Sequence, residues 1–279
     1  MRTARQKEDG NACYHVISRV IDRRMLLDEE EKTRMMDLMR RTAGFCGVEV
    51  MTFAALDNHF HLLLQIPQPQ DISDEELIRR LGFLYGQGTV RKHARALGRL
   101  REVHDHEGAN AYKQRFTYRM HDLSEYMKTF KQRFTQSYNR RHSRKGTLWE
   151  DRFKSILLQQ PLDDRRNPST MVTSVAEVGL YIDLNAVRAG MVDDPAGYGF
   201  CGYGQAVAGH EDARRGIVSI VSSIHPVADW ATACENYSQM LGTRIVAPDG
   251  GAASAKPGEC RAPCYRDAMT PQRPARTSS

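Results

Sequence analysis

The fold of this chain is decided by residues 48–66, VEVMTFAALDNHFHLLLQI. Two largely apolar runs, residues 48–56 and 59–66, flank the polar pair Asp57-Asn58, which predicts two strands joined by a turn into a hairpin. Successive side chains of a strand alternate between faces, so we expect His59 and His61 on one face and Phe60 in the core. Two adjacent imidazoles make half of a catalytic metal site, although such a pair on a half-buried strand is more often structural or incidental.

The segments around this hairpin predict further strands and helices. Strands are expected over residues 14–19 and 153–158, and helices over residues 29–42, 124–140 and 170–187. The helix that begins at Ser124 has an aromatic residue at every fourth position, which indicates a face packed on a sheet rather than a base-stacking surface: Tyr126, Phe130, Phe134 and Tyr138. This order of elements predicts the α+β class, with a central antiparallel sheet and helices packed on it.

Length and composition indicate a globular chain. Its 279 residues are 41% hydrophobic, enough to bury a core, which predicts one main domain with appendages. The sequence has no apolar run near the length of a membrane span and no signal segment, so we expect a soluble intracellular protein. The six cysteines lack the paired spacing of metal fingers, and reduced thiols are expected. The net charge of +6 is modest, so the clustering of basic residues is more informative than their total.

Three parts of the chain are predicted to lie outside the sheet. Residues 71–120 form a polar helical insertion or mobile subdomain, and glycines interrupt its pattern at Gly82, Gly86, Gly88 and Gly98. Residues 205–246 are interpreted as a helical C-terminal extension with one helix over residues 226–241. Residues 247–279 are rich in Gly, Ala and Pro and are predicted to be a disordered tail.

A tyrosine and an asparagine supply the expected second half of the site. Tyr181 and Asn185 are four residues apart in the predicted helix, which places them on one face of one turn. With His59 and His61, the amide oxygen of Asn185 gives a mixed donor set, suited to Mg2+ or Mn2+ when a substrate phosphate completes the shell. Tyr181 would be the nucleophile, assisted by the metal or by a base because a neutral phenol attacks poorly. On composition alone, a packed helix tyrosine is the commoner alternative.

Four motifs, taken in order, resemble those of a known family. They are YHVISR at residues 14–19, LDNHFHLLLQIP at 56–67, YNRRHSRKGTLWEDRFKSILL at 138–158 and YIDLNAVRAGMV at 181–192. Together they resemble the REP-associated tyrosine transposases, of the single-tyrosine HUH transposase superfamily, from about residue 13 to residue 203. The chain departs from the family at Val20, where glycine is common, at Ala186, where proline is common, and in the length of residues 71–120.

The resemblance implies a site, a fold and a domain assignment. His59 and His61 would ligate a divalent metal ion, Asn185 would be the third ligand, and Tyr181 would be the nucleophile. The implied fold is the ferredoxin-like fold of HUH endonucleases, and the transposase domain would span residues 1–204. The implied activity is cleavage and strand transfer of single-stranded DNA at hairpin-forming repeats through a 5′-phosphotyrosine.

Basic residues that would contact DNA gather in two parts of the chain. The larger set lies within residues 128–154, and a smaller set follows residue 18. Phosphate contacts by such residues supply affinity that does not depend on sequence. Trp149 lies beside the larger set and either stacks on unpaired bases or anchors the following strand. The predicted DNA-contacting residues are Arg19, Arg23, Lys128, Lys131, Arg140, Arg141, Arg144, Lys145, Trp149, Arg152 and Lys154.

The predicted function is that of a transposase, a metal-dependent endonuclease and strand transferase. Its partner would be single-stranded or hairpin DNA, with no membrane and no nucleotide cofactor, because the phosphotyrosine ester conserves the energy needed for rejoining. We expect a cytoplasmic, nucleoid-associated monomer or homodimer. Two alternatives are a metal phosphoesterase that uses activated water and a non-catalytic protein that binds repeat DNA. His15, His121 and His142 receive no role.

Overall fold

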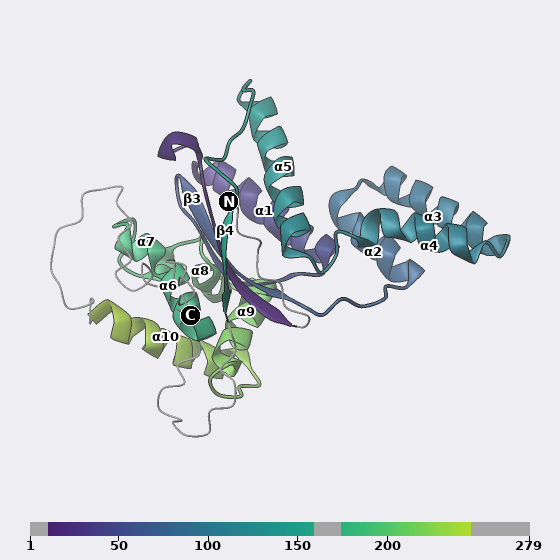
Figure 1. The fold of residues 1–279 in the computed structure, drawn as a ribbon. Coiled ribbons are helices and arrows are strands. Elements are labelled where there is room, and N and C mark those ends of the chain that lie inside the picture. Colours follow the sequence, from purple (N-terminus) through teal and green to yellow (C-terminus); the bar gives the residue numbers. More distant parts are fainter. Residues whose placement is uncertain (1–10, 159–173, 247–279) are drawn as a thin grey trace, which may run out of the picture.

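An antiparallel sheet of four strands forms the centre of the computed structural model, which describes residues 11–158 and 174–246 (Figure 1). In spatial order the strands are β2 (Glu49–Ala55), β3 (His59–Ile66), β1 (Ala12–Arg19) and β4 (Lys154–Leu158). Every neighbouring pair is antiparallel. A helix joins β1 to β2, and β3 lies between these two strands, so the sheet contains a split βαβ unit. The predicted α+β class with a central antiparallel sheet is confirmed.

The predicted hairpin is formed by β2 and β3 around the turn at Asp57 and Asn58. The N–H of Leu56 donates to the carbonyl of His59 at 2.8 Å and closes the turn. Phe60 is buried in an apolar layer on one face of the sheet, whereas His61 lies on the other face, level with Ile17 of β1. Strand alternation therefore separates the apolar layer from the histidines, as the sequence predicts.

Two helices cover the apolar face of the sheet. α1 (Glu29–Cys46) begins after Asp28, whose carboxylate accepts a hydrogen bond from the N–H of Glu31, and ends at Gly47, which adopts a left-handed conformation with φ of +64°. α5 (Leu123–Arg141) turns its aromatic stripe into the same layer, where the rings of Phe60 and Phe130 are 5.5 Å apart. The stripe packs on the sheet, as predicted.

Helices of the C-terminal half cover the opposite face. They are α6 (Ser174–Asp183), α7 (Asn185–Arg188), α8 (Gly202–Val207), α9 (Glu211–Ser222) and α10 (Trp230–Val246). Within residues 205–246, where the sequence predicts one helix over residues 226–241, the structure adds α9 and starts the last helix at Trp230. α9 approaches β2 closely, because a Cβ at Gly216 would lie 2.1 Å from the carbonyl oxygen of Met51. The C-terminal region thus shares a core with the sheet.

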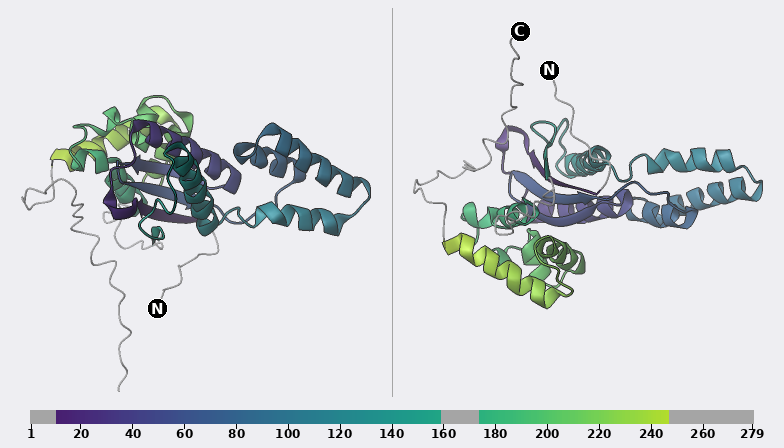
Figure 2. Two further views of the ribbon diagram at one scale, coloured as in Figure 1. Left: turned by 90° about the horizontal axis from the view of Figure 1, so that it is seen from above. Right: turned by 60° about the horizontal axis from the view of Figure 1, so that its bottom comes forward.

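The insertion between β3 and α5 consists of α2 (Asp74–Leu84), α3 (Gln87–Glu102) and α4 (His106–Thr117). Figures 1 and 2 show these helices extending away from the sheet as an arm. Of the four glycines predicted to interrupt the helices, only Gly86 lies at a break, where it precedes α3. Among the described residues, short 3-10 turns lie at Ile21–Arg23 and Pro195–Gly197.

Some predictions concern residues outside the described ranges. The predicted tail, residues 247–279, and the start of the predicted helix at residues 170–173 belong to this group. Within the described ranges, none of the helices combines the length and the apolar character needed to cross a membrane.

Candidate metal and tyrosine site

Three histidines meet on the face of the sheet opposite α1 and α5. β3 carries His59 and His61, whose ring centroids are 5.1 Å apart. β1 adds His15, whose Nε2 lies 2.9 Å from Nδ1 of His61 and whose ring stacks on that of His61. His15 pairs with Leu63 across the two strands, so it lies diagonally from His61 on the same face. The alternation of β1 indicates this face, but only the pairing register shows that His15 meets His61.

Hydrogen bonds fix which nitrogen of His59 carries the proton. Nδ2 of Asn58 donates to the carbonyl oxygen of Arg23 at 3.1 Å, and the Oδ1 end of the same amide lies 2.6 Å from Nδ1 of His59. Because Oδ1 only accepts, Nδ1 is the protonated nitrogen of the neutral ring, and Nε2 keeps a free lone pair. This Nε2 atom is buried and has no hydrogen-bond partner within the described part of the chain.

His61 is arranged similarly, and all three rings are neutral at pH 7. Its Nδ1 faces His15, and its Nε2 is buried without a hydrogen-bond partner among residues 11–158 and 174–246. Burial is the largest cause that lowers the pKa of His61 well below its ordinary value, and the neighbouring His15 and His59 lower it further. Burial also lowers the pKa of His15 and His59 to about 4, with Arg19 adding to the effect at His59. Neutral imidazole is the form that binds metal ions.

α6 brings Tyr181 against these histidines. The half-buried Tyr181 ring is edge-on to His61 and His15, with centroids 5.8 Å and 6.0 Å away. The guanidinium carbon of Arg188, in α7, lies 4.9 Å from the Tyr181 ring centroid, and its Nη1 donates to the Tyr181 carbonyl oxygen at 3.3 Å. The tyrosine therefore contacts both the histidine cluster and a cation. The spacing of seven residues, two helical turns, is the signal in the sequence that could have identified Arg188.

The position of α6 is set by the fully buried carboxylate of Asp183. It accepts hydrogen bonds from the hydroxyl of Thr52 at 2.9 Å, the N–H of Tyr203 at 3.0 Å and the hydroxyl of Tyr237 at 2.7 Å. Burial raises the pKa of Asp183 to about 6, although these hydrogen bonds act in the opposite direction. One side chain thus ties the end of the tyrosine helix to β2, α8 and α10.

Asn185 does not continue the helix that carries Tyr181. The predicted helix over residues 170–187 is interrupted at Leu184, because α6 ends at Asp183 and α7 begins at Asn185. The Asn185 side chain bridges the interruption, since its Nδ2 donates to the carbonyl oxygen of Tyr181 at 2.9 Å. The amide Oδ1 is left as the atom that could bind a metal ion, and the role of Asn185 as third ligand stays a prediction.

The donor set fits a divalent metal ion only in part. No group of three or more His, Cys, Asp or Glu side chains in residues 11–158 and 174–246 could hold a metal ion by itself. The two buried Nε2 atoms of His59 and His61 are nevertheless suitable ligands, and leaving such an atom without a partner costs about 1–3 kcal/mol. These residues fit a site that an oxygen ligand and the substrate would complete.

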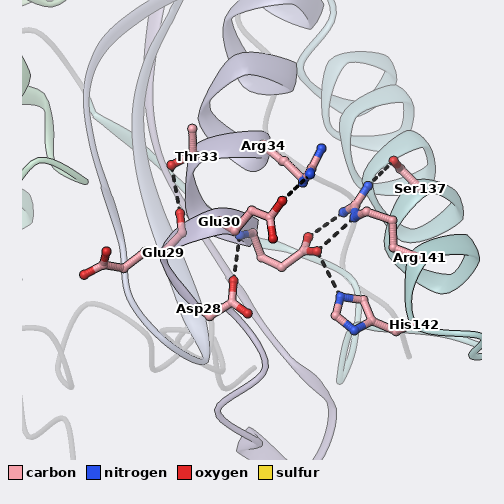
Figure 3. Close-up of polar contacts among 9 residues, drawn as sticks. Asp28, Glu29, Glu30, Thr33, Arg34, Ser137, Arg141 and His142 are labelled. Atoms are coloured by element: carbon pink, nitrogen blue, oxygen red, sulfur yellow. Dashed lines mark hydrogen bonds and ion pairs between the residues drawn. The ribbon is translucent and has the colours of Figure 1, made fainter.

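Two of the predicted DNA-contacting residues have structural roles. Trp149 is only 6% exposed, packs against Phe60 with ring centroids 5.4 Å apart, and donates from Nε1 to the hydroxyl of Thr135 at 2.9 Å. Trp149 therefore anchors the sheet, and this position does not support the prediction that it stacks on bases. Figure 3 shows Arg141 reaching from α5 toward α1, where its Nε donates to the buried Glu31 carboxylate at 2.9 Å. Arg141 thus forms an ion pair within the fold, and its contact with phosphate stays a prediction.

The other predicted DNA-contacting residues lie at the surface or make local contacts. Those with exposed side chains and no described ion pair are Arg23, Arg140, Lys145, Arg152 and Lys154. Local contacts are made by Lys128 with Glu125, Lys131 with the carbonyl of Asp151, and Arg144 with Asn139. Arg19 pairs with His59 across β1 and β3. Contacts of these residues with DNA stay a prediction.

The N-terminal part of the chain matches a known family. Residues 10–95 match the family described as "Transposase IS200 like". The resemblance to transposases is thereby confirmed for this segment. The IS200-like segment contains β1, β2 and β3 with all three histidines, and it ends before Tyr181.

The chain is also similar to solved structures. One of them is described as a REP-associated tyrosine transposase bound to a REP hairpin, and it is 14% identical in sequence, with a TM-score of 0.45. The similarity covers 75% of this chain and 87% of that one. No curated protein matches the sequence.

Proposed function

We propose that this protein is a metal-dependent endonuclease and strand transferase for single-stranded DNA, which acts on hairpin-forming repeats through a 5′-phosphotyrosine on Tyr181. The observation that carries the proposal is the pair of buried, unpartnered Nε2 atoms of His59 and His61 beside the Tyr181 ring, as found within the described ranges. The match of residues 10–95 to IS200-like transposases supports the same class of activity. The preference for hairpins rests on the motif resemblance.

His59 and His61 would hold Mg2+ or Mn2+ through their Nε2 atoms, with the amide oxygen of Asn185 as a further ligand. When bound, such an ion polarises a phosphoryl oxygen and stabilises the charge that develops on it. His15 would be a positioning residue. If Nδ1–H of His61 donates to Nε2 of His15 across the 2.9 Å contact, the Nε2 lone pair of His61 is directed to the ligand site.

Tyr181 would carry the covalent chemistry. Its phenol oxygen forms a bond to phosphorus while the bond from phosphorus to the 3′-oxygen breaks. The phenol loses its proton and the departing 3′-oxygen gains one, so the upstream fragment ends in a 3′-hydroxyl. A 3′-hydroxyl can later reverse the exchange and rejoin the strand, so no nucleotide cofactor is required. The guanidinium of Arg188, beside the Tyr181 ring, adds positive charge where the attacked phosphate would lie.

The test uses single-stranded hairpin oligonucleotides labelled at the 3′ end and Mn2+. Wild type is expected to give a denaturation-resistant adduct that carries the label, because Tyr181 would retain the 5′-phosphate of the downstream fragment. Tyr181→Phe should abolish the adduct, whereas Tyr118→Phe, which alters a tyrosine that is 60% exposed and follows the end of α4, should retain it. EDTA should also abolish the adduct.

Two outcomes would contradict the proposal. Cleavage without an adduct would identify a phosphoesterase that uses activated water. Binding that is indifferent to EDTA, without cleavage of any hairpin in a broad set, would identify a non-catalytic repeat-binding protein.

A further inference from the structure

We propose that the arm formed by α2, α3 and α4 binds the phosphate backbone of duplex DNA through one face of α3, and that this duplex is the stem of the hairpin substrate. The face consists of Arg91, Lys92, Arg95 and Arg99, here called the α3 basic face. This inference rests on the proposed function for the identity of the nucleic acid. It assigns a role to the insertion, which carries none of the residues of the tyrosine site.

The four side chains lie on one side of α3. At 3.6 residues per turn, they fall within an arc of about 100° around the helix axis. All four are exposed, whereas Val90 and Leu97 on the opposite side are buried. α3 packs against both α2 and α4, so its apolar side is already covered and its basic side is left to solvent.

The charges of the α3 basic face are not neutralised within the arm. Two of the three acids at the start of α2 pair with other cations, Glu76 with Arg79 and Arg80, and Asp74 with Arg101 and Lys113. The third, Glu75, forms no ion pair within the described part of the chain. None of the four residues of the α3 basic face forms an ion pair or a side-chain hydrogen bond with another residue that the structure describes. Four unpaired cations on one face need an anionic partner outside the chain or a layer of counterions.

The dimensions and the chemistry of the face fit a DNA backbone. From Arg91 to Arg99 the helix rises about 12 Å. One strand of B-DNA places a phosphate every 3.4 Å along the axis, so a helix lying along it would meet about three phosphates. The face includes no aromatic side chain that could stack on unpaired bases, which favours a duplex stem over a single strand.

The position of the arm is also suited to this role. Figures 1 and 2 show that the arm extends away from the sheet, so it reaches beyond the body that holds the tyrosine site. Within residues 128–154, Arg140, Lys145, Arg152 and Lys154 are also exposed and form no described ion pair, but they lie outside the arm. The α3 basic face therefore adds four cations, which form no ion pair within the described residues, on the part of the molecule that extends beyond the body.

The experiment compares the affinity of three full-length proteins for a hairpin with a long stem, over a range of salt concentrations. The test variant replaces Arg91, Lys92, Arg95 and Arg99 by Gln. The control variant replaces Arg34, Arg41, Arg215 and Arg244 by Gln, which changes the net charge equally at four side chains that are 45–70% exposed and lie outside the arm. Circular dichroism checks that both variants keep the wild-type helix content.

The test variant is expected to bind the hairpin about tenfold or more weakly near 0.1 M salt, with a slope of log affinity against log salt that is shallower by about 3. The control is expected to stay within about twofold of wild type, since the four charges that it removes are paired with acidic side chains of the chain itself rather than with DNA. On a single strand without a stem, the test variant and the control should bind equally. A loss of affinity on the single strand as large as on the hairpin would overturn the assignment to the duplex.

Failure of this inference can be separated from failure of the proposed function. If wild type forms the Tyr181 adduct and the test variant binds hairpins with the same salt slope as the control, only the role of the α3 basic face is overturned. If wild type neither binds hairpins nor forms the adduct, both proposals fall.

Discussion

Asn58 determines the protonation of His59. The amide donates to the carbonyl of Arg23 at 3.1 Å, so it can only accept from Nδ1 of His59, which lies 2.6 Å away. The carbonyl, the amide and the imidazole thus form one chain, at whose end Nε2 of His59 keeps a lone pair for a ligand.

Replacing Asn58 by Ala is expected to weaken Mn2+ binding. The variant removes the acceptor that holds Nδ1–H of His59, and loss of such a partner costs about 10–100-fold in metal affinity. Titration calorimetry measures the effect without any need for activity. Asn58→Asp keeps an acceptor for Nδ1–H and should lose less. Equal affinity for wild type and Asn58→Ala would contradict the assigned tautomer.

His15→Phe should also lower Mn2+ affinity, by about tenfold or more, because Nδ1 of His61 loses its partner. His15→Gln offers a side-chain oxygen in its place and should recover part of the affinity. Nitrogen NMR of the imidazoles gives a second readout, since His61 should become a mixture of tautomers in His15→Phe. If the tautomer of His61 is unchanged in this variant, His15 has only a packing role.

Arg188→Gln is expected to slow formation of the Tyr181 adduct by about 100-fold, the usual cost of removing one group that stabilises developing charge. Mn2+ affinity should not change, because Arg188 contacts the Tyr181 ring and not the histidines in the contacts described. Single-turnover kinetics separates the two effects, with the exposed Arg215→Gln as a charge-matched control. If Arg188→Gln formed the adduct at the same rate as the control, Arg188 would have no role in stabilising the developing charge.

The buried carboxyl of Asp183 should make the folded state less stable as the pH rises. Its pKa is raised from 3.8 to about 6 in the folded protein, so the folded state holds this proton more tightly than the unfolded chain does. The contribution is fully present below about pH 4 and is lost as the pH rises through about 6. Relative to Asp183→Asn, the free energy of unfolding of wild type should therefore fall by about 3 kcal/mol over this window. Denaturant titrations at several pH values measure the free energy of unfolding of both proteins. If the two free energies changed with pH in parallel, the raised pKa of Asp183 would be refuted.

Arg141 and its neighbour Arg140 should respond differently to substitution by Gln. Arg141→Gln leaves the Glu31 carboxylate, which is 2% exposed, with fewer partners and should destabilise the fold by about 3 kcal/mol. Arg140→Gln changes an exposed side chain and should lower DNA affinity without a change in stability. Denaturant unfolding and DNA-binding titrations of both variants measure these two effects. If Arg141→Gln lost DNA affinity at unchanged stability, Arg141 would be a DNA contact and not a structural residue.

Much of the sheet could be predicted from the sequence, because strand alternation is local. The bounds of β3 and the placement of His59 and His61 on one face follow from residues 59–66 alone. The contribution of His15 depends on the register between β1 and β3, which joins residues 46 positions apart. Such a register is not visible in a single strand.

Packing between distant elements explains most of what the sequence did not reveal. Asp183 is hydrogen-bonded to Thr52, 131 residues away, and Arg141 to Glu31, 110 residues away. Partners so far apart in the sequence do not fall within one short motif, so the sequence pattern does not reveal them. The sequence places Trp149 and Arg141 in one basic, aromatic segment. The fold distinguishes them, because Trp149 is buried in the layer between α1, α5 and the sheet, whereas the exposed Arg141 pairs with the buried Glu31 of α1.

The alternation of β1 and β3 makes folding and the assembly of the site a single event. A slip of one residue in their pairing would exchange the two faces, burying imidazoles among the apolar side chains and exposing Phe60 to the phosphate side. A mispaired molecule would lose its core and the histidine cluster together, so a stable molecule that lacks only the site is not expected. Under the proposed function, the fraction of molecules able to cut DNA is then the fraction that has paired its strands correctly.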